Sequence, residues 1–147
     1  MKRFIIILIL LLSGMNEMLA QKGLAVNEQF DGSKPYYENA TRVWVEGKDL
    51  AAYHLTLYKS ITVKGNAEAA KDMERAVTTD SKLALSKEIG HVGSRLYYAF
   101  LSLPGKQHNR YIFFRNASLR AGGADEVTLV YMEGNVSMEQ LKQMFKK

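Results

Sequence analysis

The sequence predicts a single α+β domain built on a mainly antiparallel sheet of about five strands. Segments that alternate apolar and polar residues are separated by turns containing Gly, Pro and Asn, which is typical of antiparallel strands. Two other segments carry the apolar spacing and capping residues of helices. A chain of 147 residues with 47% apolar and 24% charged residues fits one globular domain and excludes a disordered chain.

The N-terminus has the layout of a secretory signal peptide. Basic residues 2–3 precede an unbroken apolar run over residues 4–12, and the small residue Ala20 marks a cleavage point. The rival interpretation is a membrane anchor, but a span needs about 20 apolar residues, and Asn16 and Glu17 interrupt this one. We therefore expect residues 1–20 to be removed on export, which leaves no stable membrane span.

The exported part divides into an arm and a domain. Residues 21–40 are polar, with a turn-forming Asp-Gly-Ser-Lys-Pro run at 31–35, and are expected to form an N-terminal arm or loop. Residues 41–147 are expected to form the α+β domain in the order β-β-α-β-β-β-α. The five expected strands cover residues 41–46, 55–63, 95–103, 110–116 and 127–132.

Two helices complete the predicted fold. Asn66 is a good N-cap for a long helix over residues 67–89, which is rich in Ala, Glu, Lys and Leu. Gly90 and Gly93 are expected to end this helix. Ser137 and Gln140 have the spacing of a capping box at the start of a C-terminal helix. Its expected sheet-facing residues are Met138, Leu141 and Phe145.

Charge and cysteine content exclude several classes of protein. Lys and Arg number 20 against 15 Asp and Glu, for a net charge of +5. The basic residues are spread among acidic ones rather than clustered, so nucleic-acid binding is not expected. The absence of cysteine excludes disulfides, a thiol nucleophile and a thiolate metal site, and an exported chain without disulfides fits a Gram-negative periplasm or envelope.

A search for catalytic motifs finds none. His54, His91 and His108 are not spaced as helical metal ligands, and neither a phosphate-binding glycine loop nor a nucleophile elbow is present. His91 is expected in a glycine-bounded loop, where a solvated role is the ordinary one. The sequence therefore predicts no catalytic residue, no metal site and no cofactor.

Asp80 is the acidic residue of most interest. On a continuous helix it lies near the middle of the apolar face, where a carboxylate must be paired or neutralised. A raised pKa there would suit a general acid or base. Two structural alternatives stay open: Asp80 caps a second helical segment, or it bonds a neighbouring cation or backbone group.

Aromatic residues on the expected strands are candidates for a binding surface. Alternation places aromatic side chains on both faces of the sheet, and the two helices are expected to cover one face. The other face is left for a ligand, a second subunit or cover by the arm through Phe30, Tyr36 and Tyr37. The candidate residues are Trp44, Tyr58, Tyr97, Tyr111 and Tyr131.

Several segments resemble a family of small exported proteins of Bacteroides-type bacteria that is known only as a domain of unknown function. They are Ala20-Gln21, residues 55–60, 95–98, 109–111 and 128–134, and Ser137 to Leu141. These are strand and helix patterns spread over most of the mature chain. The resemblance implies export and one α+β domain and carries over no catalytic residue.

Two function classes follow. The favoured one is a non-catalytic binding or interaction domain of the bacterial envelope, with a small ligand, an envelope protein or a second copy of the chain as partner. The alternative is a small hydrolase or isomerase that uses isolated acids and histidines, such as Asp80 and His91. An enzyme should bring one of these residues to another titratable group in a pocket, whereas a binding domain should expose an aromatic patch.

Overall fold

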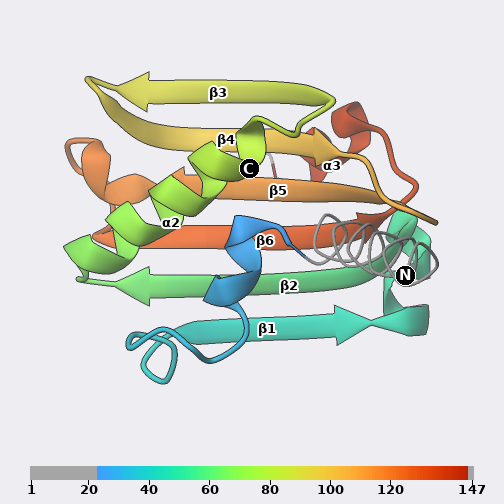
Figure 1. Cartoon of the computed structure of the whole chain (residues 1–147), viewed down its shortest axis with the longest axis horizontal. Helices are drawn as coiled ribbons and strands as arrows, with labels where there is room; N and C mark the ends of the chain where they lie inside the picture. The colour runs from blue at the N-terminus through green and yellow to red at the C-terminus, as the bar shows by residue number, and fades with distance from the viewer. Residues whose placement is uncertain (1–22, 146–147) are drawn as a thin grey trace, which may run out of the picture.

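The computed structural model describes residues 23–145 and shows one antiparallel six-stranded sheet with helical elements packed on both faces (Figure 1). The expected α+β single domain is confirmed, with one strand more than predicted. In chain order the elements are η1 (Ala25–Gln29), β1 (Thr41–Glu46), η2 (Gly47–Tyr53), β2 (Leu55–Lys64), α2 (Ala67–Ser81), β3 (Ser86–Val92), β4 (Arg95–Leu103), β5 (Asn109–Asn116), η3 (Ala117–Leu119), β6 (Glu126–Gly134) and α3 (Met138–Phe145).

The strands are ordered β1-β2-β6-β5-β4-β3, so β6 lies in the middle of the sheet, and β1 and β3 form its edges. Directly opposed residues of antiparallel strands share a face. One such row runs from Trp44 through Lys59 and Tyr131 to Ile112. This row lies on the face that α2 covers, called here the α2 face. The next row, from Val45 through Tyr58 and Met132 to Tyr111, lies on the opposite face, called the α3 face.

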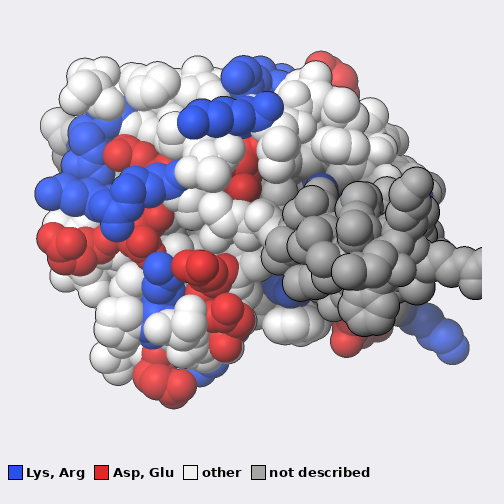
Figure 2. Space-filling model, in the orientation of Figure 1, with Lys and Arg blue, Asp and Glu red and all other residues white. Residues whose placement is uncertain are grey.

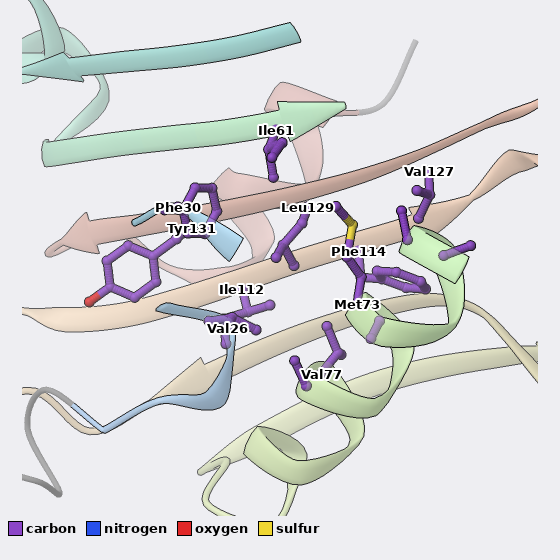
Figure 3. Packing of buried hydrophobic residues seen from close by; sticks show 14 of the residues in the cluster. Val26, Phe30, Ile61, Met73, Val77, Ile112, Phe114, Val127, Leu129 and Tyr131 are labelled. Atoms are coloured by element: carbon purple, nitrogen blue, oxygen red, sulfur yellow. The ribbon is translucent and has the colours of Figure 1, made fainter. Parts of the chain in front are cut away.

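The α2 face holds the larger part of the core. Figure 3 shows Met73 and Val77 of α2 and Val26 of η1 converging on Ile112 and Phe114 of the sheet. The arm, expected as a loop, therefore lies across the sheet and contributes to the core. Its buried core residues are Leu24, Val26, Phe30 and Tyr36.

The α3 face carries a smaller core that η2 and α3 cover. Leu141 of α3 and Leu50 of η2 pack with Phe100, Phe113 and Met132 of the sheet. The expectation that both helices cover the same face is thus wrong. Because α2 and the arm together fill one face, the C-terminal helix that follows the central strand β6 packs on the other.

The start of α3 follows the predicted capping box. The Ser137 hydroxyl accepts a hydrogen bond from the Gln140 N–H at 3.1 Å, and the Gln140 side chain accepts one from the Ser137 N–H at 3.2 Å. Met138 and Leu141 pack against the sheet as expected. The side chain of Phe145, the third predicted contact, lies outside the described residues.

The predicted helix over residues 67–89 is wrong for its last eight residues, 82–89. Asn66 caps α2 as expected, accepting from the Ala69 N–H at 3.0 Å, but the helix ends at Ser81. The Leu85 N–H bonds the Ser102 carbonyl, and residues 86–92 then form β3 beside β4. Gly93 therefore starts a tight hairpin turn with φ of 62° instead of ending a helix.

Candidate functional site: a cation–aromatic hollow beside strand β1

Three cross-strand neighbours on the α2 face bring a lysine between aromatic rings. The Lys59 ammonium lies 4.1 Å from the ring centroid of Trp44 and 5.7 Å from that of Tyr131. Phe30, delivered by the arm, adds a third ring at 5.9 Å. All three distances are within the range of cation–π attraction, which is strongest for tryptophan.

The aromatic rings are the main partners of this ammonium. Among the described residues, none forms a hydrogen bond or an ion pair with Lys59, and the side chain is half-buried. Burial lowers the pKa of Lys59, while the more distant charges of Glu133 and Glu46 act in the opposite direction. The site therefore holds a positive charge that no contacting carboxylate neutralises.

A hollow of about 460 Å³ opens beside this lysine. Trp44 forms part of its wall and is 58% exposed, which is unusual for the only tryptophan of the chain. The Arg42 guanidinium lies 4.1 Å from the ring centroid of Tyr37, which brings a second cation to the wall. The hollow is lined by Phe30, Tyr37, Ala40, Arg42, Val43, Trp44, Lys59 and Ser60, and we call it the β1 hollow.

The structure separates the five predicted binding residues. Trp44 and Tyr131 lie on the α2 face, Tyr58 and Tyr111 lie on the α3 face on either side of Met132, and the Arg120 guanidinium lies over Tyr97. Only Trp44 is largely exposed. The set therefore does not form one aromatic sheet face, and Trp44 is its only member in the wall of the β1 hollow.

Two of these tyrosines have structural hydrogen bonds. The buried Tyr111 hydroxyl donates to the Val136 carbonyl at 2.6 Å and so fixes the segment that leads into α3. The Tyr131 hydroxyl donates to the Glu133 carboxylate at 2.5 Å. Burial, together with this bond to a carboxylate, raises the pKa of Tyr131, so the phenol stays protonated.

Lys59 and the arm residues were not among the predicted site residues. The sequence does carry a signal for Lys59, because it is the one charged residue that interrupts the apolar positions of an otherwise alternating strand. Phe30 and Tyr37 were expected only as a possible cover of the sheet, because their place in the hollow depends on how the arm folds back.

Asp80 holds the arm in place. Its two carboxylate oxygens accept the Ala25 N–H at 2.7 Å and the Val26 N–H at 3.0 Å, and the residue is 1% exposed. Burial raises the pKa of Asp80, although these two bonds and the charge of Arg110 oppose the rise. Of the alternatives open from sequence, bonding to backbone groups is therefore the one observed.

A second acid fastens the arm further along α2. The Asp72 carboxylate accepts hydrogen bonds from the Gln29 amide and the Tyr36 hydroxyl, and pairs with Lys34 at 3.0 Å and Arg75 at 3.2 Å. Burial would raise the pKa of Asp72, but the hydrogen bonds outweigh it and hold the pKa below its usual value. The arm is thus fixed by two carboxylates of one helix.

The histidines do not assemble a catalytic group with Asp80. His91 is exposed within strand β3, which corrects the expectation of a loop, and exposed His54 ends η2 with φ of 59°. His108 lies in the β4–β5 turn, with its Nδ1 3.3 Å from the Asn135 amide nitrogen. Within residues 23–145, no three His, Asp or Glu side chains gather closely enough to hold a metal ion.

Three further hollows lie elsewhere on the described part of the domain, and one of them, of about 480 Å³, is where Asp72 fastens the arm. The other two differ from the β1 hollow in their lining. One, of about 570 Å³, surrounds the β4–β5 turn at His108, Arg110 and Glu133. Two of its charged groups have partners in the fold, since Arg110 Nε donates to the Pro104 carbonyl and the Glu133 carboxylate accepts a hydrogen bond from the Tyr131 hydroxyl. The other, of about 310 Å³, is apolar and lies between η2 and α3 on the α3 face. Neither combines an uncompensated charge with an exposed aromatic ring.

The charged surface of the α2 face is mixed. Figure 2 shows its Lys and Arg side chains lying among Asp and Glu side chains, with no large area of a single sign. Within residues 23–145, no helix has the length and apolar character that crossing a membrane needs.

Comparison with known proteins places the chain in a family. The model of a family of unknown function, DUF6108, matches residues 14–145, which is nearly the whole chain, so the chain belongs to this family. No curated protein matches the chain.

Proposed function

We propose that this member of the DUF6108 family is exported to the periplasm or cell envelope of a Gram-negative, Bacteroides-type bacterium and acts there as a non-catalytic binding domain. The β1 hollow is the proposed binding site. The observation that carries the proposal is the half-buried Lys59 ammonium beside the exposed ring of Trp44. Among residues 23–145 this ammonium has aromatic neighbours but no contacting carboxylate. Both features are costly or unusual in a surface that binds nothing.

The site favours a ligand with an anionic group and a flat apolar part. A ligand carboxylate at Lys59 would supply the negatively charged partner that the fold does not provide. A charge-assisted hydrogen bond is stronger at a half-buried site than in open water. The exposed indole of Trp44 offers a flat apolar surface on which a ring can stack. A second cation, Arg42, stands in the same wall.

Calorimetric titration with benzoate and benzamide tests this charge and shape requirement. The two probes share a planar ring, and only benzoate carries a negative charge. We expect benzoate to bind in about the millimolar range, as a single ion pair with one stacked ring allows, and benzamide to bind at least about ten-fold more weakly, the factor that corresponds to 1.4 kcal/mol.

Matched lysine variants locate the charge that matters. Lys59→Met keeps an unbranched apolar side chain but removes the ammonium, so benzoate affinity should fall to that of benzamide. Lys64→Met removes an exposed lysine of the same strand and should leave the affinity unchanged. Equal binding of both probes, or equal effects of both variants, would refute the proposed site.

Export is tested separately by the mass of the mature protein. The basic start and apolar run of residues 2–12 should direct cleavage after Ala20. Intact-mass measurement of protein recovered from the cells that make it should therefore show a chain without residues 1–20. A chain that keeps these residues would contradict export by cleavage and leave the ligand proposal standing.

A further inference from the structure

The outer edge of β1 is open. Within residues 23–145, β1 pairs only with β2, and five of its six residues are exposed, including Val43 at 44%. Its pairing with β2 runs from Thr41 to Glu46 without a bulge. An exposed, regular edge of this kind presents unpaired backbone N–H and C=O groups that can accept another strand.

The opposite edge of the sheet differs. β3 contains an irregularity at Gly90 and His91, where its register with β4 shifts. Lys87 and Glu88 are exposed on it, and the Glu88 carboxylate pairs with Lys142 of α3. Bulges and charges of this kind are devices that protect an edge from pairing, and β1 has no bulge.

The residues of β1 are self-complementary about Trp44. When two copies of the strand pair antiparallel around this residue, Arg42 lies opposite Glu46 of the other copy, twice by symmetry. On the other side of the sheet, Val43 lies opposite Val45 of the other copy, and the two Trp44 residues face each other at the centre. Opposite charges and apolar pairs are the favourable cross-strand neighbours.

The neighbouring registers lack this complementarity. In a symmetric antiparallel pair, opposed residues must lie on the same face of the sheet. The two-fold axis therefore has to pass through a residue position of β1, and the alternative registers are those centred on another residue of the strand. Centring on Val43 places Arg42 opposite Trp44, and centring on Val45 places Trp44 opposite Glu46. Only the pairing about Trp44 brings the two charges together.

The two charges are available for such pairing. The described residues supply no ion pair to Arg42 or Glu46; the guanidinium lies over the Tyr37 ring, and Glu46 is exposed at the end of the strand. We propose that β1 is a homodimer interface, in which two copies of the chain pair antiparallel about Trp44 and join their sheets into one. This dimer does not depend on a ligand and goes beyond the proposed binding function.

The pairing would also place the two β1 hollows next to each other. Val43 and Trp44 belong both to the edge strand and to the wall of the hollow, so each hollow borders the two-fold axis. The area buried by pairing two six-residue edges is small compared with the roughly 1,600 Å² buried in a stable interface. The dimer should therefore be weak and concentration-dependent.

Charge reversal across the interface tests the pairing. Sedimentation of the purified protein from about 1 μM to about 1 mM, the range in which weak affinities fall, should show a monomer–dimer equilibrium. Arg42→Glu and Glu46→Arg should each weaken dimerisation about ten-fold, because each places two pairs of like charges opposite each other. The double variant restores both pairs with reversed sign and should recover the dimer.

Cysteine cross-linking tests the register. Because the chain has no native cysteine, any disulfide that forms must involve the introduced residue. Directly opposite residues have Cα atoms about 4.5–5.5 Å apart, which a disulfide spans. Trp44→Cys should therefore form a covalent dimer on mild oxidation. Thr41→Cys is the matched control, because the two copies of residue 41 would be about 20 Å apart.

The outcomes separate the possibilities. A dimer that responds to single reversals, recovers in the double variant and cross-links at position 44 supports the proposal. A monomer at every concentration, a dimer indifferent to the charge reversals, or equal cross-linking at position 41 would overturn it. Circular dichroism of each variant confirms that its sheet is intact, and the double variant distinguishes lost pairing from lost folding.

Discussion

Single side chains set the chemical character of the β1 hollow. Lys59 occupies a position on β2 where the strand pattern calls for an apolar residue, and it is surrounded by rings instead of carboxylates. Asp80 is far more buried, each of its carboxylate oxygens accepts a hydrogen bond from a backbone N–H group, and its role is structural. Lys59 is half-buried and has no contacting counter-ion among the described residues, and for that reason we propose it as the group that binds the ligand.

The lowered pKa of Lys59 gives benzoate binding a specific pH dependence. Burial disfavours the ammonium, so it loses its proton at a lower pH than an ordinary lysine at 10.5, while a carboxylate stays ionised above about pH 6. Benzoate affinity should thus be full near neutral pH and decline before pH 10.5. Calorimetry at increasing pH checks this, and a constant affinity up to that pH would show that Lys59 does not bind the anion.

Removal of the Asp80 carboxylate should loosen the arm. Asp80→Ala leaves the N–H groups of Ala25 and Val26 without their acceptors, at a cost of about 1–3 kcal/mol for each buried donor. Asp80→Asn keeps one acceptor oxygen and should cost less. Urea unfolding measures both losses, and a change within about 0.5 kcal/mol for Asp80→Ala, the size of a surface substitution, would contradict the role given to this residue.

At the scale of elements, local sequence signals were reliable for strands and unreliable for the end of α2. Four of the five predicted strands agree with the structure to within one residue at each end, and the fifth extends two residues further, to Gly134. Residues 82–89 have helical composition, but the backbone of Leu85 bonds Ser102, and pairing with β4 takes over. Pairing with a neighbouring strand thus outweighs helix propensity. The residues of segment 82–89 alone cannot reveal that such a neighbour is present.

The Tyr98 ring should make glycine necessary at position 90 of β3. Gly90 lies opposite Tyr98, and a Cβ added there would stand 2.3 Å from a ring carbon of that tyrosine. Gly90→Ala should therefore lower the free energy of unfolding by about 1–3 kcal/mol. In a Tyr98→Leu background the ring is absent, and the same change should be neutral or stabilising; thermal unfolding of the four proteins compares the two costs, and equal costs would be inconsistent with this contact.

At the scale of the whole molecule, both faces of the sheet are covered, by the arm and α2 on one side and by η2 and α3 on the other. The sequence indicated the arm as one possible cover through Phe30 and Tyr36, and the structure confirms that both are buried there. The sequence could not indicate that α2 and α3 lie on opposite faces of the sheet, because their placement depends on the order of the strands. An open aromatic face is therefore absent from residues 23–145. The large hydrophobic residues that remain exposed lie at both edges of the sheet, with Val43 and Trp44 on β1 and Ile89 and Val92 on β3.

The most direct test of this account is the indole N–H resonance of Trp44, which is the only tryptophan signal in the spectrum of the protein. If the β1 hollow binds anions through Lys59, benzoate should shift this resonance progressively to saturation in a ¹H–¹⁵N spectrum. Benzamide should leave it nearly unmoved, and benzoate should not shift it in Lys59→Met. A Trp44 resonance that ignores benzoate, or that responds equally in the Lys59→Met variant, would contradict the assignment of the hollow as the binding site.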